Sequence, residues 1–120
     1  MTARKRILFV EDEPDTLALM TLGLRSAGFV VEAVGTVAEA QALLDGARYD
    51  VVIADWRLPD GEGLAVADRA AGLGNKTIIY SSYLFQIPAG TALRHELLMK
   101  PMRPREFVAA VERCIGMDNR

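Results

Sequence analysis

Residues 51–63 read VVIADWRLPDGEG, in which four apolar residues are followed by an aspartate and then by a turn rich in proline and glycine. A continuous apolar run of this length is typical of a strand that is buried on both faces of a sheet. The run stops at the carboxylate of Asp55. A single acid in such a position is ordinarily a turn or helix-capping residue, so its meaning depends on which other residues reach the same point.

The rest of the chain alternates similar apolar runs with segments of helical period. We expect five strands and four main helices, with the strands at residues 7–10, 29–34, 50–54, 76–82 and 96–99 and the helices beginning at Pro14, at Thr36, at Gly63 and near Pro104. Strict alternation of apolar strands and helices predicts an α/β fold, in which a doubly wound, five-stranded parallel sheet carries helices on both faces. A closed barrel of eight such units would need about twice this length.

The composition is that of an ordinary globular domain, with 51% hydrophobic and 25% charged residues over 120 positions. Fourteen basic and sixteen acidic residues leave a net charge of −2, so a large basic surface for nucleic acid is not expected. No apolar stretch approaches the roughly 20 residues that span a bilayer, and the single Cys114 excludes an internal disulfide and suits a reducing compartment. We therefore expect one domain over residues 1–120, located in the cytoplasm, without direct contact to nucleic acid or membrane.

Polar side chains follow the expected strands at the points where these strands end. They are Glu11, Asp12 and Glu13 after the first, Asp55 after the third, Ser81 and Ser82 at the end of the fourth, and Lys100 with Pro101 after the fifth. In an open parallel sheet, ligands bind at this carboxyl edge, where the winding direction reverses. If the first and third strands are neighbours, three carboxylates, a hydroxyl and an ammonium group converge there.

The charges of such a cluster predict a metal site. Two carboxylates about 5 Å apart repel by roughly 3 kcal/mol at an effective dielectric constant near 20. Three of them need a cation or must take up protons, and Lys100 supplies only one positive charge. Carboxylate oxygens and water are the ligands that Mg²⁺ prefers, so we expect Mg²⁺ as the cofactor.

A divalent ion, a lysine and a hydroxyl around one carboxylate also form a site for a phosphoryl group. Asp55 could attack phosphorus as a nucleophile, while the cations neutralise the phosphoryl oxygens and the hydroxyl donates to one of them. Each residue alone has a plainer interpretation as a turn acid, a solvated loop lysine or a strand-end hydroxyl. Their coincidence at successive strand ends favours a site.

Three segments, FVEDEPD (9–15), ADWRLPDGEGL (54–64) and LLMKPMRPREFVAAV (97–111), resemble the signature segments of the response-regulator receiver domain of two-component signalling. The resemblance covers essentially the whole chain and implies a flavodoxin-like sheet of strand order 2-1-3-4-5. It implies that Asp55 accepts a phosphoryl group from a kinase phosphohistidine. Ser81 would be the switch hydroxyl, and Lys100 would pair with Asp55 or its phosphate beside a cis Lys100-Pro101 peptide. Mg²⁺ would be bound by Asp12, by Asp55, by the backbone carbonyl of Arg57 and, through water, by Glu11.

Residues 80–101 depart from the usual receiver pattern. Pro88 and Gly90 interrupt any helix between the last two strands, so we expect a short, irregular or mobile fourth helix. SSY (81–83) followed by IP (87–88) is similar to a subset of mostly stand-alone receivers, and it leaves open whether Ser81 or Ser82 is the switch hydroxyl. Leu97 stands where many receivers carry a switch aromatic, a role that Tyr80 or Tyr83 could take.

Two further residues are expected to have no part in the chemistry. His95 is the only histidine, and we interpret it as a solvated loop residue, since no second histidine or cysteine lies beside it. Cys114 falls on the apolar face of the last helix and is expected to be a core residue.

The favoured function is a phosphorylation-activated switch that is not an enzyme, except that it assists its own phosphotransfer and dephosphorylation. Its expected partners are a histidine kinase or phosphotransfer protein and a downstream protein target. One alternative is a phosphorylation-independent interaction module of the same fold. Another is a metal-dependent phosphatase, which is disfavoured because Arg57 stands where such enzymes typically place a second acid. The chain is either a stand-alone regulator, which we favour, or part of a longer protein.

Overall fold

The computed structural model describes residues 4–116, and it confirms the α/β fold with a five-stranded parallel sheet in the expected order. The strands lie in the spatial order β2 (Val30–Val34), β1 (Arg6–Val10), β3 (Val51–Asp55), β6 (Lys76–Ser81) and β7 (Glu96–Met99). Each neighbouring pair is parallel. Two short antiparallel strands, β4 (Arg57–Leu58) and β5 (Gly61–Glu62), form a separate ribbon after β3.

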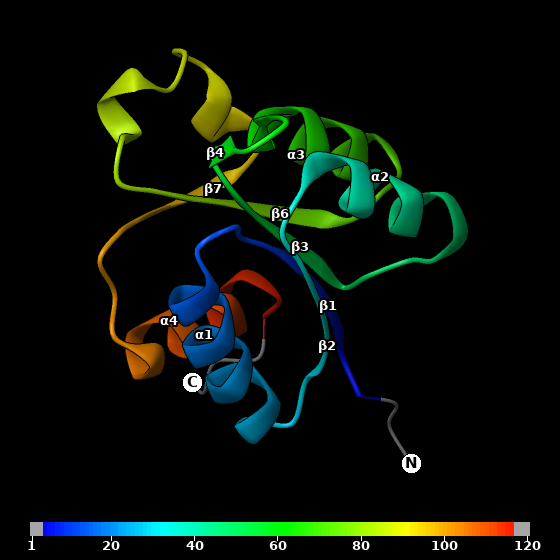
Figure 1. The fold of residues 1–120 in the computed structure, drawn as a ribbon, viewed down its shortest axis with the longest axis vertical. Helices are drawn as coiled ribbons and strands as arrows, with labels where there is room; N and C mark the ends of the chain where they lie inside the picture. The colour runs from blue at the N-terminus through cyan, green and yellow to red at the C-terminus, as the bar shows by residue number, and fades with distance from the viewer. Residues whose placement is uncertain (1–3, 117–120) are drawn as a thin grey trace.

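Helices cover both faces of the sheet. Helices α1 (Pro14–Ser26) and α4 (Pro104–Cys114) lie on one face, and α2 (Val37–Gly46) and α3 (Gly63–Gly72) lie on the other (Figure 1). Residues of β1 alternate between the two layers, because successive side chains of a strand point to opposite faces. Ile7 and Phe9 pack in the core beneath α1 and α4, whereas Leu8 and Val10 pack with residues of α2 and α3.

The helix ends follow the expected signals. Pro14 is the first residue of α1, and the Glu13 carboxylate accepts a hydrogen bond of 2.6 Å from the Thr16 N–H. Gly28 follows this helix at φ 101°, a backbone conformation that glycine adopts without a steric cost. Thr36 caps α2 through a 3.1 Å bond from the Glu39 N–H to its hydroxyl. The caps at Glu13 and Thr36 fix where helices α1 and α2 begin after β1 and β2.

The segment between β6 and β7 is irregular, as expected from Pro88 and Gly90. It contains two short 3₁₀ turns in place of a helix, η1 (Leu84–Gln86) and η2 (Thr91–Leu93). No residue of η1 is buried, whereas Thr91 of η2 is buried and its hydroxyl donates to the carbonyl of Pro88 at 2.7 Å. This segment lies beside β7 at one end of the sheet (Figure 1).

The expectation that His95 is a solvated loop residue is wrong. Its side chain has no exposed surface, its Nδ1 bonds the Thr77 hydroxyl, and its Nε2 lies 2.6 Å from an Asp68 carboxylate oxygen. The physical reason is that the short connection turns directly into β7, which brings the imidazole between β6 and α3. His95 therefore ties three elements together.

Replacement of His95 by alanine is expected to lower the free energy of unfolding by about 2–3 kcal/mol, because a buried hydroxyl loses its partner and a cavity forms. Urea unfolding monitored by circular dichroism measures this change. The matched control is Arg94→Ala, which removes a half-exposed ion pair with the same Asp68 and should cost less than about 1 kcal/mol. Equal losses for the two variants would contradict the structural role of His95.

No helix within residues 4–116 has the combination of length and apolar character that crossing a bilayer requires.

Candidate functional site

The residues singled out in the sequence meet at the carboxyl edge of the sheet. Glu11 directly follows β1, Asp55 is the last residue of β3, Ser81 is the last residue of β6, and Lys100 directly follows β7. Strand β1 lies between β2 and β3; the helix that follows β1 (α1) covers one face of the sheet, and the helix that follows β3 (α3) covers the other. A crevice at the strand ends is the usual ligand site in sheets of this topology.

Three carboxylates form a compact cluster at this edge of the sheet. Glu11, Asp12 and Asp55 each offer one oxygen atom, and these atoms all lie within 4.8 Å of one another. Glu11 is fully buried and Asp55 is 9% exposed, whereas Asp12 is open to solvent. Oxygen donors that carry negative charge and leave one side open fit a hard divalent cation such as Mg²⁺, which keeps several water ligands.

Lys100 bridges the two buried acids. Its Nζ lies 2.6 Å from Glu11 Oε1 and 3.2 Å from Asp55 Oδ2. The expected pairing of Lys100 with Asp55 is therefore present, but the shorter contact is to Glu11, which sequence reasoning did not connect to the lysine. The second oxygen of Glu11 accepts the backbone N–H of Glu13 at 3.0 Å. Both carboxylate oxygens of Glu11 are thus engaged within the protein.

The crowding of charge changes how these groups titrate. Burial and the neighbouring Glu11 carboxylate raise the pKa of Asp55 to about 6, although the Lys100 ammonium opposes this shift. Burial alone would lower the pKa of Lys100, but its hydrogen bonds and charge interactions with Glu11 and Asp55 hold that pKa above its ordinary value. The lysine thus stays charged, and Asp55 is the group that responds near neutral pH.

Removal of the lysine charge is expected to destabilise the fold. Lys100→Met leaves Glu11 and Asp55 without their shared cation, so the free energy of unfolding should fall by about 2–3 kcal/mol at pH 8 in EDTA. The penalty on an acid with a raised folded-state pKa is complete above that pKa and is lost as the pH falls toward the unfolded-state value, so the loss should shrink below pH 6. Urea unfolding at pH 8 and at a pH below 6 tests this prediction, with Lys100→Arg as the control that preserves the charge. A loss independent of pH would show that packing dominates.

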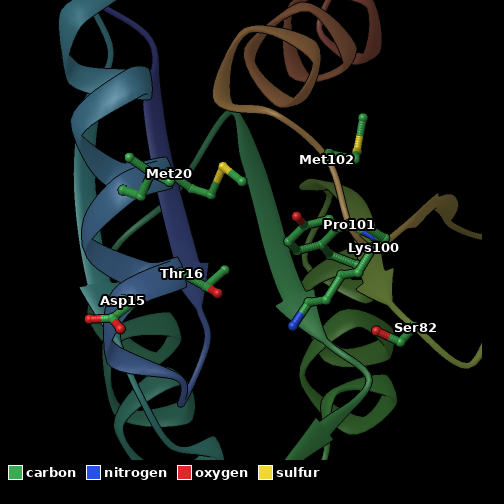
Figure 2. Close-up of a pocket in the computed structure, with 9 residues that line it drawn as sticks. Asp15, Thr16, Met20, Ser82, Lys100, Pro101 and Met102 are labelled. Carbon is green, nitrogen blue, oxygen red and sulfur yellow. The ribbon is translucent and has the colours of Figure 1, made fainter.

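The two serines at the end of β6 have different surroundings. Ser81 is fully buried, and its Oγ accepts the Tyr83 N–H at 2.9 Å. Ser82 is exposed and lines a groove of about 380 Å³, together with Lys100 and residues of α1. Figure 2 shows Lys100 and Ser82 across this groove from Asp15, Thr16 and Met20. The remaining lining residues are Leu19, Tyr80, Pro101 and Met102.

The candidates for an aromatic switch also differ in their environments. Leu97 is half-buried and packs in a small apolar cluster with Trp56 and Ile87. Tyr80 is 1% exposed, and its ring centroid lies 4.9 Å from that of Phe107, so it is part of the core. Tyr83 is 43% exposed and lies under the guanidinium of Arg57. Tyr83 is thus the tyrosine on the surface of the site.

Two backbone features hold the edge in place. The Lys100-Pro101 peptide is cis, as the resemblance implied. Gly63, the first residue of α3, approaches Asp55 so closely that a Cβ added to it would lie 1.8 Å from the Asp55 carbonyl oxygen. The N–H of Gly63 donates to the carbonyl of Trp56 at 2.8 Å. The position of Asp55 is thereby set against the start of a helix.

Comparisons with known proteins agree with this geometry. Residues 7–112 match the response regulator receiver domain family. The chain is 30% identical over 114 residues to the DNA-binding response regulator MtrA of Mycolicibacterium smegmatis, a match covering 92% of the chain and 50% of MtrA. Thus the chain spans half or less of the length of the curated relatives first matched.

Solved structures share the fold over nearly the whole chain. A CheY-like receiver domain from Methanospirillum hungatei has a TM-score of 0.83 and 26% identity, with 94% of each chain covered. The response regulator TrrA from Thermotoga maritima, solved in complex with Mg²⁺-BeF, has a TM-score of 0.81 and 26% identity, with 92% of this chain and 98% of TrrA covered. The chain belongs to the response regulator receiver domain family of two-component signalling.

Proposed function

We propose that this protein is a phosphorylation-activated signalling switch in which Asp55 accepts a phosphoryl group from a phosphohistidine. The observation that carries this proposal is the arrangement around Asp55. Its carboxylate ends a central strand, lies 3.2 Å from the Lys100 ammonium, and forms a cluster with the Glu11 and Asp12 carboxylates. TrrA, which is 26% identical to this chain and was solved in complex with Mg²⁺-BeF, supports a proposed reaction that depends on Mg²⁺.

In the proposed reaction, an oxygen of the Asp55 carboxylate attacks phosphorus. A new P–O bond forms while the P–N bond of the phosphohistidine breaks, and the imidazole nitrogen keeps the electron pair and takes up a proton. Lys100 neutralises one phosphoryl oxygen, and the hydroxyl of Ser81 donates to another. The protein thus acts as a phosphoacceptor that assists its own phosphorylation and dephosphorylation, without turning over a separate substrate.

We propose that Mg²⁺ is held by Asp12, by Asp55, by the backbone carbonyl of Arg57 and, through water, by Glu11. The water-mediated role of Glu11 is supported by its two oxygens, which already accept from Lys100 and from the Glu13 N–H. Mg²⁺, when bound, would supply positive charge for the phosphoryl oxygens. The residues of the chain would orient the carboxylate and shield it from bulk solvent.

The proposed partners are a histidine kinase or phosphotransfer protein as the donor and a downstream protein as the target. The net charge of −2 favours protein contacts over direct contact with nucleic acid or membrane. We propose residues 1–120 as a single receiver domain that works in the cytoplasm, where the thiol of Cys114 suits reducing conditions.

Incubation with Mg²⁺ and acetyl phosphate tests the proposed function. Intact-protein mass spectrometry should detect one added phosphoryl group per chain, and hydroxylamine should remove it because an aspartyl phosphate is an acyl phosphate. EDTA should prevent the addition. Absence of any addition at millimolar Mg²⁺ would instead support a phosphorylation-independent interaction module, and sustained turnover of phosphate esters would support a phosphatase.

Binding of Mg²⁺ is expected to change the fluorescence of Trp56, which is 5% exposed and adjoins Asp55. Because the pKa of Asp55 is about 6, its carboxylate is mainly ionised at pH 7.5 and only about a quarter ionised at pH 5.5. The apparent dissociation constant for Mg²⁺ should therefore rise about fourfold between these pH values, since protons compete with the metal. Fluorescence titrations measure this rise, and a pH-independent constant would contradict a role for Asp55 in binding the metal.

A further inference from the structure

The charged groups around Asp55 share one face of the sheet with an aromatic ring. Glu11, Asp55 and Lys100 each come two residues after a side chain that packs in the core beneath α1 and α4. Because alternate side chains of a strand point to the same face, the three groups project from that face as well. Tyr80 of β6 belongs to the same core and pairs in register with Asp55. The tyrosine ring therefore lies beside the charged cluster.

Lys100 reaches its carboxylate partners by crossing the strand that carries this ring. Lys100 follows β7, whereas Asp55 ends β3, on the far side of β6. Strands β7 and β3 lie two strand spacings apart, about 10 Å. The backbone N–H of Lys100 donates to the carbonyl of Ser81, the last residue of β6, at 2.9 Å. From that anchor the Lys100 side chain extends into the groove (Figure 2) and crosses the end of β6 to reach Asp55.

The Tyr80 ring is a fixed surface beneath the crossing ammonium. The Nζ of Lys100 lies 5.0 Å from the centre of this ring, which is within the range of a cation–π contact. Tyr80 is 1% exposed and packs against Phe107, whose ring in turn packs against Phe9 with the centroids 5.4 Å apart. Burial raises the pKa of Tyr80, so the phenol stays neutral and offers the ammonium the face of its ring.

The ring and Glu11 attract the ammonium from opposite sides of Asp55. Tyr80 is on β6, which neighbours β3 directly, whereas Glu11 follows β1 on the other side of β3. The contact of Lys100 with the fully buried Glu11 is the shorter one, at 2.6 Å, against 3.2 Å for the contact with Asp55. Without the attraction of the ring, the ammonium would move toward Glu11 and away from Asp55.

We propose that Tyr80 is a positioning residue that holds the Lys100 ammonium at Asp55 through the face of its ring. The ammonium can then neutralise a phosphoryl oxygen without first leaving Glu11, which is the advantage of preorganised charge in phosphoryl transfer. Tyr80 itself contacts neither the phosphoryl group nor the metal. This inference rests on the proposed function and adds to it a residue that acts through Lys100.

Replacement of Tyr80 by pentafluorophenylalanine tests the role of the ring face. The fluorine atoms nearly keep the shape of phenylalanine but withdraw electrons from the ring, so its face no longer attracts a cation. With Mg²⁺ and acetyl phosphate, Tyr80→Phe should gain a phosphoryl group at about the wild-type rate, and Tyr80→pentafluorophenylalanine about fivefold more slowly. Tyr80→Leu, which removes the ring, should be slowed at least as much. Intact-protein mass spectrometry over time measures these rates.

Phe29→Leu is the matched control for lost packing. Phe29 is a buried aromatic residue of the same core cluster, and it precedes β2, so it lies at the opposite end of the sheet from the site. This variant should lower the free energy of unfolding but leave the rate of phosphoryl addition unchanged.

Two results would overturn the proposal. One is an equal rate for the Tyr80→Phe and Tyr80→pentafluorophenylalanine proteins, and the other is a Phe29→Leu protein that is slowed as much as Tyr80→Leu. Either result leaves the phosphoacceptor function of Asp55 intact. Absence of phosphoryl addition to the wild type would instead overturn the proposed function, and this inference with it.

Discussion

Asp55→Asn is expected to abolish phosphoryl addition from acetyl phosphate while leaving the fold intact. The amide of asparagine is a poor nucleophile toward phosphorus, and it removes one of the three carboxylates that surround the proposed metal site. Lys100 keeps its 2.6 Å contact with Glu11, so the buried ammonium stays paired. Intact mass spectrometry in the presence of Mg²⁺ should show one added phosphoryl group on the wild type and none on the variant.

The same variant is expected to be more stable than the wild type at pH 7.5 in EDTA. Burial and the charge of Glu11 raise the pKa of Asp55 from 3.8 to about 6, which means that the folded state disfavours the ionised carboxylate. The penalty is complete above the folded-state pKa and absent below the unfolded-state pKa. The variant should therefore gain about 2–3 kcal/mol at pH 7.5 and almost nothing near pH 4, as measured by urea unfolding.

Asp60→Asn is the matched control for both effects. The carboxylate of Asp60 is exposed and accepts hydrogen bonds from the N–H groups of Val37 and Ala38, and these bonds lower its pKa. Its replacement should leave phosphoryl addition unchanged and should not stabilise the protein at pH 7.5. Phosphoryl addition to the Asp55→Asn protein at the wild-type yield would exclude Asp55 as the acceptor.

Gly63→Ala is expected to cause a severe loss of stability, although it adds only one methyl group. The new Cβ would lie 1.8 Å from the Asp55 carbonyl oxygen, 2.9 Å from its carbonyl carbon and 3.2 Å from the Ala54 side chain. The first two atoms are backbone atoms of a central strand, so no side-chain rotation relieves the overlap. We expect a loss of more than about 4 kcal/mol in the free energy of unfolding, or a failure to fold.

Gly72→Ala provides the control at the other end of the same helix. A Cβ at Gly72 would meet nothing within 4 Å, and alanine has the higher helix propensity, so this variant should be neutral or gain up to about 1 kcal/mol. Urea unfolding of both variants measures the difference. If some of the Gly63→Ala protein folds, weaker Mg²⁺ binding measured by Trp56 fluorescence would indicate that Asp55 is displaced. A Gly63→Ala protein as stable as the wild type would contradict the close approach of Gly63 to the Asp55 backbone.

Much of the fold could be predicted because its signals are local. The alternation of apolar runs and capped helices placed the five strands to within one or two residues, and the end of the run at Asp55 placed that carboxylate at the sheet edge. Glu11, Asp12 and Lys100 could be assembled with it because each follows a strand, and the carboxyl ends of parallel strands meet at one edge. The resemblance to receiver domains added the roles of these residues.

Other features depend on side-chain directions that no local pattern contains. The interaction of His95 with Asp68 joins residues 27 positions apart, and it exists because the segment before β7 is short. The contact of Lys100 with Glu11 is 2.6 Å and that with Asp55 is 3.2 Å, and the sequence does not distinguish distances this similar within one cluster. The position of Tyr83 under Arg57 follows from the path of the chain into the 3₁₀ turn η1, which no helical period in the sequence indicates.

The opposite charges of the site are carried by strands that differ in how they are anchored. Glu11 and Asp55 lie at the ends of β1 and β3, each flanked by a strand on both sides, whereas Lys100 follows β7, which pairs only with β6. A four-residue edge strand with no buried residue should open locally at a lower free-energy cost than the buried central strands. Loss of order from that edge would remove the ammonium and leave the carboxylates in place. We expect the partly unfolded protein to bind divalent metal more tightly and to accept a phosphoryl group less readily.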